Sequence, residues 1–213
     1  MRKITGRSEM SGKSMGGTQE MKFYDITREL FSTPVYPGDP VPEHEWLKQI
    51  KNGDSSNLTY LKLCAHNATH MDAPRHFVEG GRTIDELELS QVMGMCSVVE
   101  YDGMLDAKTA QALICGKEKK ILLKGNRCVF QEETAQVFAD AGIGLLGVER
   151  QTVGPDGDTK GVHEILLGAD MALIEGLCLD GVEPGDYFLC AQPLKLAGVE
   201  GSPCRAVLIK EVE

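Results

Sequence analysis

Residues 66–77, which read HNATHMDAPRHF, constrain the local fold more than any other stretch of this chain. The stretch holds three of the five histidines of the 213-residue sequence, in the pattern H-x3-H-x-D-x3-H. A helix would bring His66 and His70 onto one face, four residues apart. Asp72 would then leave that face, and Pro74 would end the helix almost at once. We therefore predict that His66 ends a strand and that the remaining ligands lie on the loop after it.

The residue types in this stretch suit a divalent metal. A straight strand would hold His66 and His70 about 13 Å apart, which is too far to share one ion. The chain must therefore curl between them, and the small residues Ala68 and Thr69 permit this. Imidazole nitrogen and carboxylate oxygen, here from Asp72, are ligands that zinc prefers and manganese tolerates. The alternative is a set of loop histidines that make ordinary hydrogen bonds.

The rest of the chain alternates short strand-like runs with helical patterns. Strands are predicted over residues 22–27, 56–66, 96–101, 120–124, 144–149, 171–177, 186–192 and 204–210. Helices are predicted over residues 83–94, 106–115, 131–142 and 162–168. Four prolines within residues 33–44 predict an extended loop with turns. This mixture indicates one α/β domain whose core is a mixed β-sheet flanked by helices.

Charge and composition limit the partners of the chain. Lys plus Arg total 22 and Asp plus Glu total 32, so the formal charge is −10, which disfavours nucleic acid and anionic membrane surfaces. No apolar run is long enough to span a bilayer. Residues 1–21 lack the apolar core of a secretory signal and are interpreted as a flexible lead-in to a domain over residues 22–213. The seven cysteines form no CxxC pair, which indicates thiols in a reducing, cytoplasmic setting.

The stretch HNATHMDAPRHF resembles the HxGTHxDxPxH signature of the cyclase family of metal-dependent hydrolases, which includes bacterial kynurenine formamidase and isatin hydrolase. Three further runs resemble segments of that family in the same order, TPVYPGDP, GVHEILLGADMALIEGL and EGSPCRAVLI. The resemblance covers most of residues 22–213. It implies the swivelling β/β/α fold of that family, hydrolysis of a non-peptide amide in a small-molecule substrate, and assembly into a homodimer or homotetramer.

The resemblance also implies a ligand set for one or two divalent ions per subunit. His66, His70 and Asp72 would bind a first metal, and Asp72 would also reach a second. His163 would bind the second metal, and Glu175 would touch both. Zn²⁺ is the expected ion, with Mn²⁺ as the alternative.

The residues themselves leave alternatives open at three positions. His76 is implied by the resemblance to stay off the metals as general base and acid, but it could instead be a third imidazole ligand. Glu175 ends an apolar run, where a buried carboxylate needs a cation or a donor, unless it faces solvent. His163 opens a short predicted helix and, taken alone, is typical of a surface histidine.

Two departures from the family pattern bear on the substrate. The usual glycine of HxGTH is Ala68, and alanine disfavours φ > 0, so the curl should differ slightly. Tyr36 stands where the formamidases have tryptophan; it would stack on an aromatic substrate or serve as a packing residue. We expect an arylformamidase-like reaction, N-formylkynurenine to kynurenine plus formate. The alternatives are opening of a cyclic amide such as isatin, or a non-hydrolytic metal-binding or polyketide-cyclase-like protein.

Overall fold

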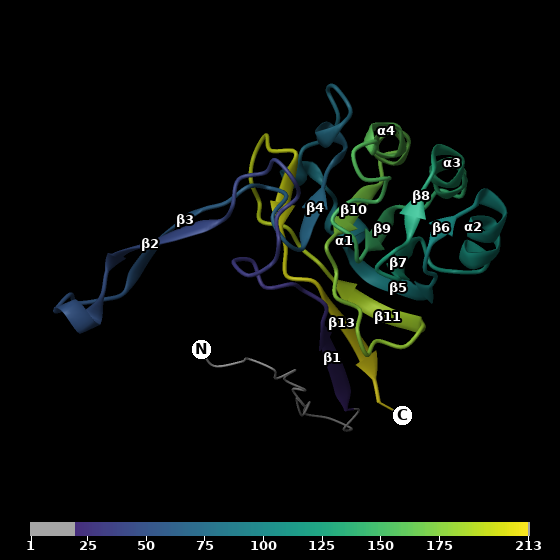
Figure 1. Cartoon of the computed structure of the whole chain (residues 1–213). Helices are drawn as coiled ribbons and strands as arrows, with labels where there is room; N and C mark the ends of the chain where they lie inside the picture. The colour runs from purple at the N-terminus through teal and green to yellow at the C-terminus, as the bar shows by residue number, and fades with distance from the viewer. Residues whose placement is uncertain (1–19, 213) are drawn as a thin grey trace.

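A nine-stranded mixed sheet forms the centre of the molecule, in the order β1-β13-β11-β5-β7-β9-β10-β4-β12 (Figure 1). The structure is a computed structural model and describes residues 20–212. The predicted lead-in over residues 1–21 therefore lies outside the described residues, apart from its last two, and Met21 is already the first residue of β1. Within the described range, no helix is both long and apolar enough to cross a lipid bilayer.

Thirteen strands and four α-helices follow one another along the described part of the chain. The strands are β1 (Met21–Asp25), β2 (Glu43–Lys48), β3 (Leu58–Lys62), β4 (His70–Asp72), β5 (Met93–Glu100), β6 (Met104–Leu105), β7 (Lys120–Lys124), β8 (Val129–Phe130), β9 (Leu145–Val148), β10 (Ala172–Glu175), β11 (Gly185–Cys190), β12 (Gly201–Pro203) and β13 (Val207–Glu211). The α-helices are α1 (Leu89–Val92), α2 (Ala107–Ile114), α3 (Glu132–Asp140) and α4 (Lys160–Gly168). Three short 3₁₀ turns, η1 (Ile50–Asn52), η2 (Pro74–His76) and η3 (Ile84–Glu86), complete the described elements.

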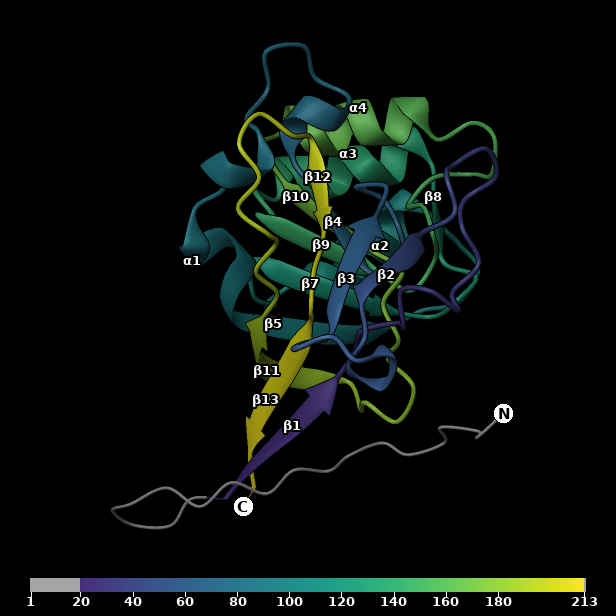
Figure 2. The ribbon, with the colours of Figure 1, turned by 90° about the vertical axis from the view of Figure 1, so that its left-hand side faces the viewer.

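The two faces of the sheet bury different apolar clusters, because successive side chains of a strand point to opposite sides. Ile121 and Leu123 of β7 pack in the cluster beneath α2, α3 and α4, with Phe138 of α3. Leu122, between them in sequence, packs in the other cluster with Tyr187 of β11. Strands β5, β7, β9 and β10 run parallel, and the outer strands are antiparallel. Figure 2 shows how the sheet curls away toward β1 and β13.

Most predicted elements are confirmed. Asp106 caps α2 by accepting a hydrogen bond from the backbone amide of Thr109 at 2.9 Å. The capping box of Thr83 and Glu86 is present, although it starts a 3₁₀ turn rather than an α-helix. Gly142 follows α3 with φ 64°, a conformation that glycine adopts without strain.

The prediction for residues 56–66 is wrong in two respects. The strand there, β3, ends at Lys62 and pairs with β2 in a two-stranded ribbon that projects from the domain (Figure 1). His66 lies in a turn beyond it, and the segment after His66, predicted as a loop, forms strand β4 inside the main sheet. Strand β4 pairs with β10 on one side and β12 on the other, so tertiary pairing makes a strand of three residues that is too short for a pattern to reveal.

Candidate metal centre

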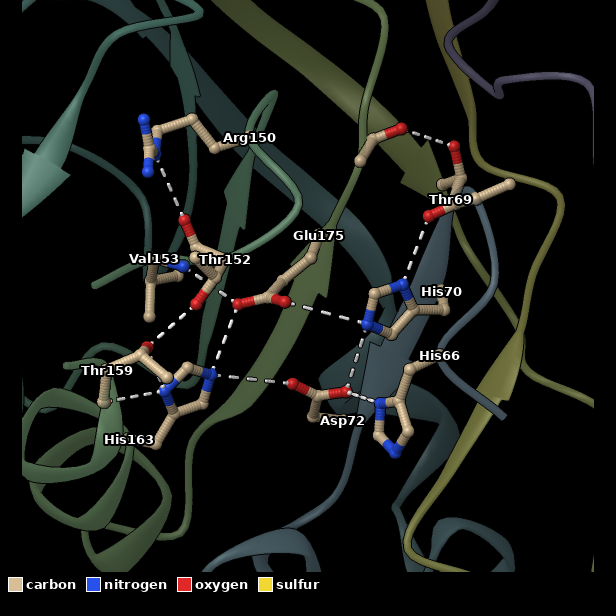
Figure 3. A network of polar contacts seen from close by, with 12 residues as sticks. His66, Thr69, His70, Asp72, Arg150, Thr152, Val153, Thr159, His163 and Glu175 are labelled. Atoms are coloured by element: carbon tan, nitrogen blue, oxygen red, sulfur yellow. Dashed lines mark hydrogen bonds and ion pairs between the residues drawn. The ribbon is translucent and has the colours of Figure 1, made fainter. Parts of the chain in front are cut away.

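Two neighbouring strands bring His70, Asp72 and Glu175 onto one face of the sheet. His70 and Asp72 are two residues apart in β4 and therefore project to the same side. Glu175, the last residue of β10, lies opposite His70 in the antiparallel register. His70 Nε2 lies 3.4 Å from Asp72 Oδ1 and 3.6 Å from Glu175 Oε2 (Figure 3). The side chains of all three residues are buried.

His66 joins this group because the chain curls between it and β4. Ala68, which replaces the usual glycine of the family motif, adopts φ 55°. This is the left-handed conformation, which is uncommon for residues other than glycine. The turn brings His66 Nδ1 to 2.9 Å from Asp72 Oδ1, and Nδ1 donates the hydrogen bond. Gly176 makes room for the curl, since a Cβ at that position would lie 2.4 Å from the Ala68 carbonyl oxygen. The predicted curl at Ala68 is thus confirmed, with the alanine in the glycine-like conformation.

Helix α4 supplies His163 from the other side of the site. His163 Nε2 lies 3.2 Å from Glu175 Oε1 and 3.9 Å from Asp72 Oδ2. Glu175 Oε1 also accepts a hydrogen bond of 2.9 Å from the backbone amide of Val153. His163 is buried, so the alternative of a surface histidine is wrong, and so is the alternative of a solvent-facing Glu175.

Backbone carbonyls fix the tautomers of two of the histidines. His70 Nδ1 donates to the Ala68 carbonyl oxygen at 3.1 Å. His163 Nδ1 donates to the Thr159 carbonyl oxygen at 2.9 Å and lies 2.7 Å from the Thr159 hydroxyl. Since a carbonyl only accepts, Nδ1 carries a proton in both rings, and Nε2 is the nitrogen that faces Asp72 and Glu175. This is the arrangement in which histidine binds metals. Although burial opposes it, the neighbouring carboxylates raise the pKa of both histidines, so a cation that binds at Nε2 displaces a proton from it.

An unsatisfied buried oxygen also indicates that these side chains could bind a divalent cation. Asp72 Oδ2 is the one buried side-chain N or O atom, among the residues that the structure describes, with no hydrogen-bond partner. A buried carboxylate oxygen without a donor is costly, and a cation would satisfy it. Potential ligand atoms lie within 4.8 Å of one another in two groups that share Asp72: one with His66 and His76, the other with His70 and Glu175.

The pKa values follow from the density of charge in the site. Burial alone would lower the pKa of His66, but the carboxylates of Asp72 and Glu200 outweigh it and raise that pKa to about 9. Burial would raise the pKa of Asp72, whereas His70 and His66 hold it far below its usual range. Burial likewise opposes ionisation of Glu175, and the histidines around it lower its pKa. The protein alone thus holds ionised carboxylates at this site, as a cation requires.

His76 occupies a different position from the other histidines. Its ring stacks on His66 with centroids 4.0 Å apart, and it lies 6.0 Å from His163, measured between ring centroids. Burial, together with the charges of His66 and His163, lowers the pKa of His76. His76 is therefore neutral near pH 7 and able to accept a proton, while its proximity to Asp72 leaves the role of third ligand open.

A cavity of about 220 Å³ opens onto these residues. Tyr36 and Asp39 of the proline-rich loop form one wall, and Phe77 and Gln151 form others. Tyr36 therefore faces the predicted site, as expected for a residue that contacts a substrate.

Glu200 and Thr159 also contact the predicted ligands, although neither was predicted from the sequence. Glu200 Oε1 lies 3.3 Å from His66 Nε2, and Thr159 orients His163 from within the same helical turn. Glu200 begins the run EGSPCR, which resembles a segment of the family without indicating a role for the glutamate. Thr159 stands four residues before His163, a spacing that would have identified it as a neighbour once the helix was accepted.

Comparisons with known proteins identify relatives of this chain. The model of a family described as "Putative cyclase" matches residues 24–119. A kynurenine formamidase of Salinibacter ruber (strain DSM 13855 / M31) is 33% identical over 214 residues, covering 88% of this chain and 97% of that protein. A solved structure of a potential metal-dependent hydrolase with cyclase activity is 27% identical with a TM-score of 0.77, covering 91% of this chain and 100% of the other.

A third relative shares the fold. Isatin hydrolase A from Labrenzia aggregata, solved with benzyl benzoate bound, has a TM-score of 0.79 at 18% identity, covering 90% of this chain and 94% of that one. The predicted α/β architecture with a mixed sheet is thereby confirmed.

Proposed function

Since the chain belongs to the cyclase family and is a metal-dependent hydrolase of amide bonds, we propose that it cleaves a small aromatic formamide. The reaction would be most like that of an arylformamidase, which converts N-formylkynurenine to kynurenine and formate. The observation that carries this proposal is the buried group of His70, Asp72 and Glu175, with Asp72 Oδ2 unsatisfied beside a cavity. The sequence identity of 33% to a kynurenine formamidase supports the choice of substrate.

The proposed ligand set is the predicted one. His66, His70 and Asp72 would hold one divalent cation, Asp72 and Glu175 would reach both positions, and His163 would hold a second. Zn²⁺ suits these imidazole and carboxylate donors best, and Mn²⁺ is the alternative. When bound, such a cation polarises a carbonyl and makes a water molecule more acidic.

His76 is proposed to move the proton during hydrolysis. A neutral ring nitrogen takes a proton from the attacking water and returns it to the departing amide nitrogen. The burial that lowers the pKa of His76 keeps it in the neutral form. Its stacking on His66 holds the ring in place at the edge of the cavity.

Tyr36 is proposed to bind the aromatic part of the substrate. Tyr36 lines the 220 Å³ cavity, which exceeds the roughly 150 Å³ that holds a benzene molecule and therefore has room for an aromatic ring. The proline-rich loop that carries Tyr36 closes on itself through a hydrogen bond of 3.0 Å from the Asp39 amide to the Tyr36 carbonyl.

The protein is further proposed to work as a homodimer or homotetramer in the cytoplasm. The β2–β3 ribbon exposes Trp46, Tyr60 and Leu61, and a two-stranded ribbon with apolar side chains in water is marginally stable unless it packs on something. A second copy of the chain is the proposed partner. All seven cysteines are free thiols, which supports a reducing compartment.

A substrate panel tests the function. The purified protein would be stripped with a chelator, reloaded with Zn²⁺ or Mn²⁺, and assayed against N-formylkynurenine, formanilide and isatin. We expect hydrolysis of the formamides that depends on the added metal. Turnover of isatin alone would assign the cyclic-amide reaction instead, and turnover of nothing by metal-loaded protein would contradict the proposal.

A further inference from the structure

A second, larger cavity adjoins the candidate metal centre. Its volume is about 810 Å³, and it shares Tyr36 and Gln151 with the smaller cavity that opens onto the histidines. The Gln151 side-chain amide donates to the Pro34 carbonyl, so the wall between the two cavities is a loop contact and a tyrosine ring. A substrate too large for the smaller cavity would therefore extend past Tyr36 into the larger one.

Arg28 lines this second cavity with a charge that no carboxylate neutralises. Its Nε donates to the Leu177 carbonyl at 3.1 Å and its Nη2 to the Glu149 carbonyl at 3.3 Å. Among residues 20–212, no carboxylate oxygen lies within 4.0 Å of its guanidinium. The Glu149 carboxylate is directed elsewhere, since it accepts hydrogen bonds of 2.8 Å from the backbone amides of Gly125 and Leu179.

Arg150 adds a second guanidinium to the same cavity. Its Nε donates to the Thr152 carbonyl at 3.3 Å (Figure 3), and its Nη2 donates to Asp156 Oδ1 at 2.5 Å. The arginine side chain is 17% exposed, whereas that of Asp156 is 82% exposed, so the acid sits at the rim and is solvated. Arg28 and Arg150 are neighbours, because Arg28 binds the carbonyl of the residue before Arg150.

Both arginines are tied to the segments that carry the predicted metal ligands. The Arg28 backbone amide donates to the Thr69 hydroxyl at 2.8 Å, and that hydroxyl donates to the Gly176 carbonyl at 2.6 Å. Thr69 precedes His70, and Gly176 follows Glu175. The Gly176 amide in turn donates to the Arg150 carbonyl at 2.7 Å. These hydrogen bonds connect the backbones of both arginines to the segments that carry the predicted ligands, as a subsite for one end of a substrate requires.

We infer that Arg28 and Arg150 form the subsite that binds the carboxylate which a substrate such as N-formylkynurenine carries at the end remote from its formamide. This inference rests on the proposed amide hydrolysis. Guanidinium groups recognise carboxylates with paired hydrogen bonds, and the two arginines keep donors that no described residue uses. In a chain of net charge −10, a local positive site favours the binding of an anionic substrate.

The test compares an acid with its own ester. The substrates would be 3-(2-formamidophenyl)propanoate and its methyl ester, which differ in charge at the end remote from the amide. The wild-type enzyme should prefer the acid, measured as the ratio of the two kcat/KM values. Arg28→Gln and Arg150→Gln should each lower this ratio about tenfold, the size expected for loss of a charged hydrogen bond. Asp156→Asn should raise it, because a competing carboxylate is removed from Arg150.

A matched control and a second readout separate this inference from the proposed function. Lys108→Gln removes one positive charge from the exposed face of α2, away from both cavities, and should leave the ratio unchanged. Calorimetric titration with the product, 3-(2-aminophenyl)propanoate, should show binding that both arginine variants weaken, whether or not any formamide is hydrolysed. Hydrolysis with no preference for the acid, or equal losses for acid and ester in both variants, would overturn the subsite and leave the hydrolase standing.

Discussion

Asp72 is the residue on which the candidate site depends. One of its oxygens contacts His66 and His70, and the other faces His163 at 3.9 Å without a hydrogen bond. A stable buried ion pair needs further hydrogen bonds to its remaining oxygen, which Asp72 Oδ2 lacks among the described residues, so a bound cation explains the geometry better. The side chains around Asp72 then have two kinds of task, to bind the cation or to move a proton, and single substitutions can distinguish these tasks.

Replacing His76 tests whether this residue moves a proton or binds the cation. We expect His76→Ala to keep its metal, measured by elemental analysis, and to lose hydrolysis by about 10²- to 10⁴-fold, the usual contribution of a general base. His70→Ala is the comparison, because it removes a buried predicted ligand and should lose metal and activity together. Loss of metal from the His76 variant would reassign that residue as a ligand.

The raised pKa of His66 predicts a dependence of stability on pH in chelator-treated protein. The folded-state pKa of about 9 exceeds the usual 6.5, so the folded form binds the proton more tightly than the unfolded form. The stabilisation is fully present below pH 6.5 and is lost as the pH rises to about 9, by roughly 2–3 kcal/mol. Denaturant unfolding from pH 6 to 9 measures it. His66→Gln should make this dependence less steep, with the remainder from His70 and His163, whose pKa values are also raised. An equally steep loss in that variant would contradict the assignment.

The left-handed conformation of Ala68 predicts that glycine is the more stable residue there. Ala68 has φ 55°, which costs a non-glycine residue about 1 kcal/mol or more. Ala68→Gly should raise the free energy of unfolding by roughly 0.5 kcal/mol after the flexibility of glycine in the unfolded chain is deducted. Ala139→Gly inside α3 is the control and should lower it by about 0.5–1 kcal/mol. A decrease for both variants would show that the turn carries no strain.

At the scale of elements, the sequence predicts those helices whose ends are set by capping residues. Helices α2 and α3 begin and end close to the predicted residues, because Asp106 caps one and Gly142 ends the other. Strand β4 could not be predicted in this way, because its three residues are extended through pairing with β10 and β12, which lie about 100 or more residues away in the chain. The β2–β3 ribbon was predicted only in part, because period and composition do not reveal that a strand leaves the core.

The exposed apolar side chains of the β2–β3 ribbon bear on how the protein assembles. Trp46, Tyr60 and Leu61 are about half exposed. If the ribbon packs on a second copy, Leu61→Glu should shift the protein to a smaller species in analytical ultracentrifugation. Lys48→Glu, a change of charge at an exposed position of the same ribbon, should leave the mass unaltered. A wild-type protein that sediments as a monomer would refute the proposed assembly.

At the scale of the whole molecule, the site depends on contacts between distant parts of the chain. His66, His70 and Asp72 could be grouped from their spacing alone. Glu175 and His163 were added through a family resemblance, and the structure brings both within 4 Å of this group. Glu200 and the arginine pair could not be predicted, because no local pattern links residues 28, 150 and 200. The curled sheet and the loops at the ends of its parallel strands place each of these residues near the site.

The most direct test of the central claim is anomalous diffraction at the zinc edge from crystals grown with Zn²⁺. We expect a peak at bonding distance from Asp72 Oδ2, shared with His163 or Glu175. A well-ordered site without a peak beside that oxygen, or with zinc bound only elsewhere, would contradict it.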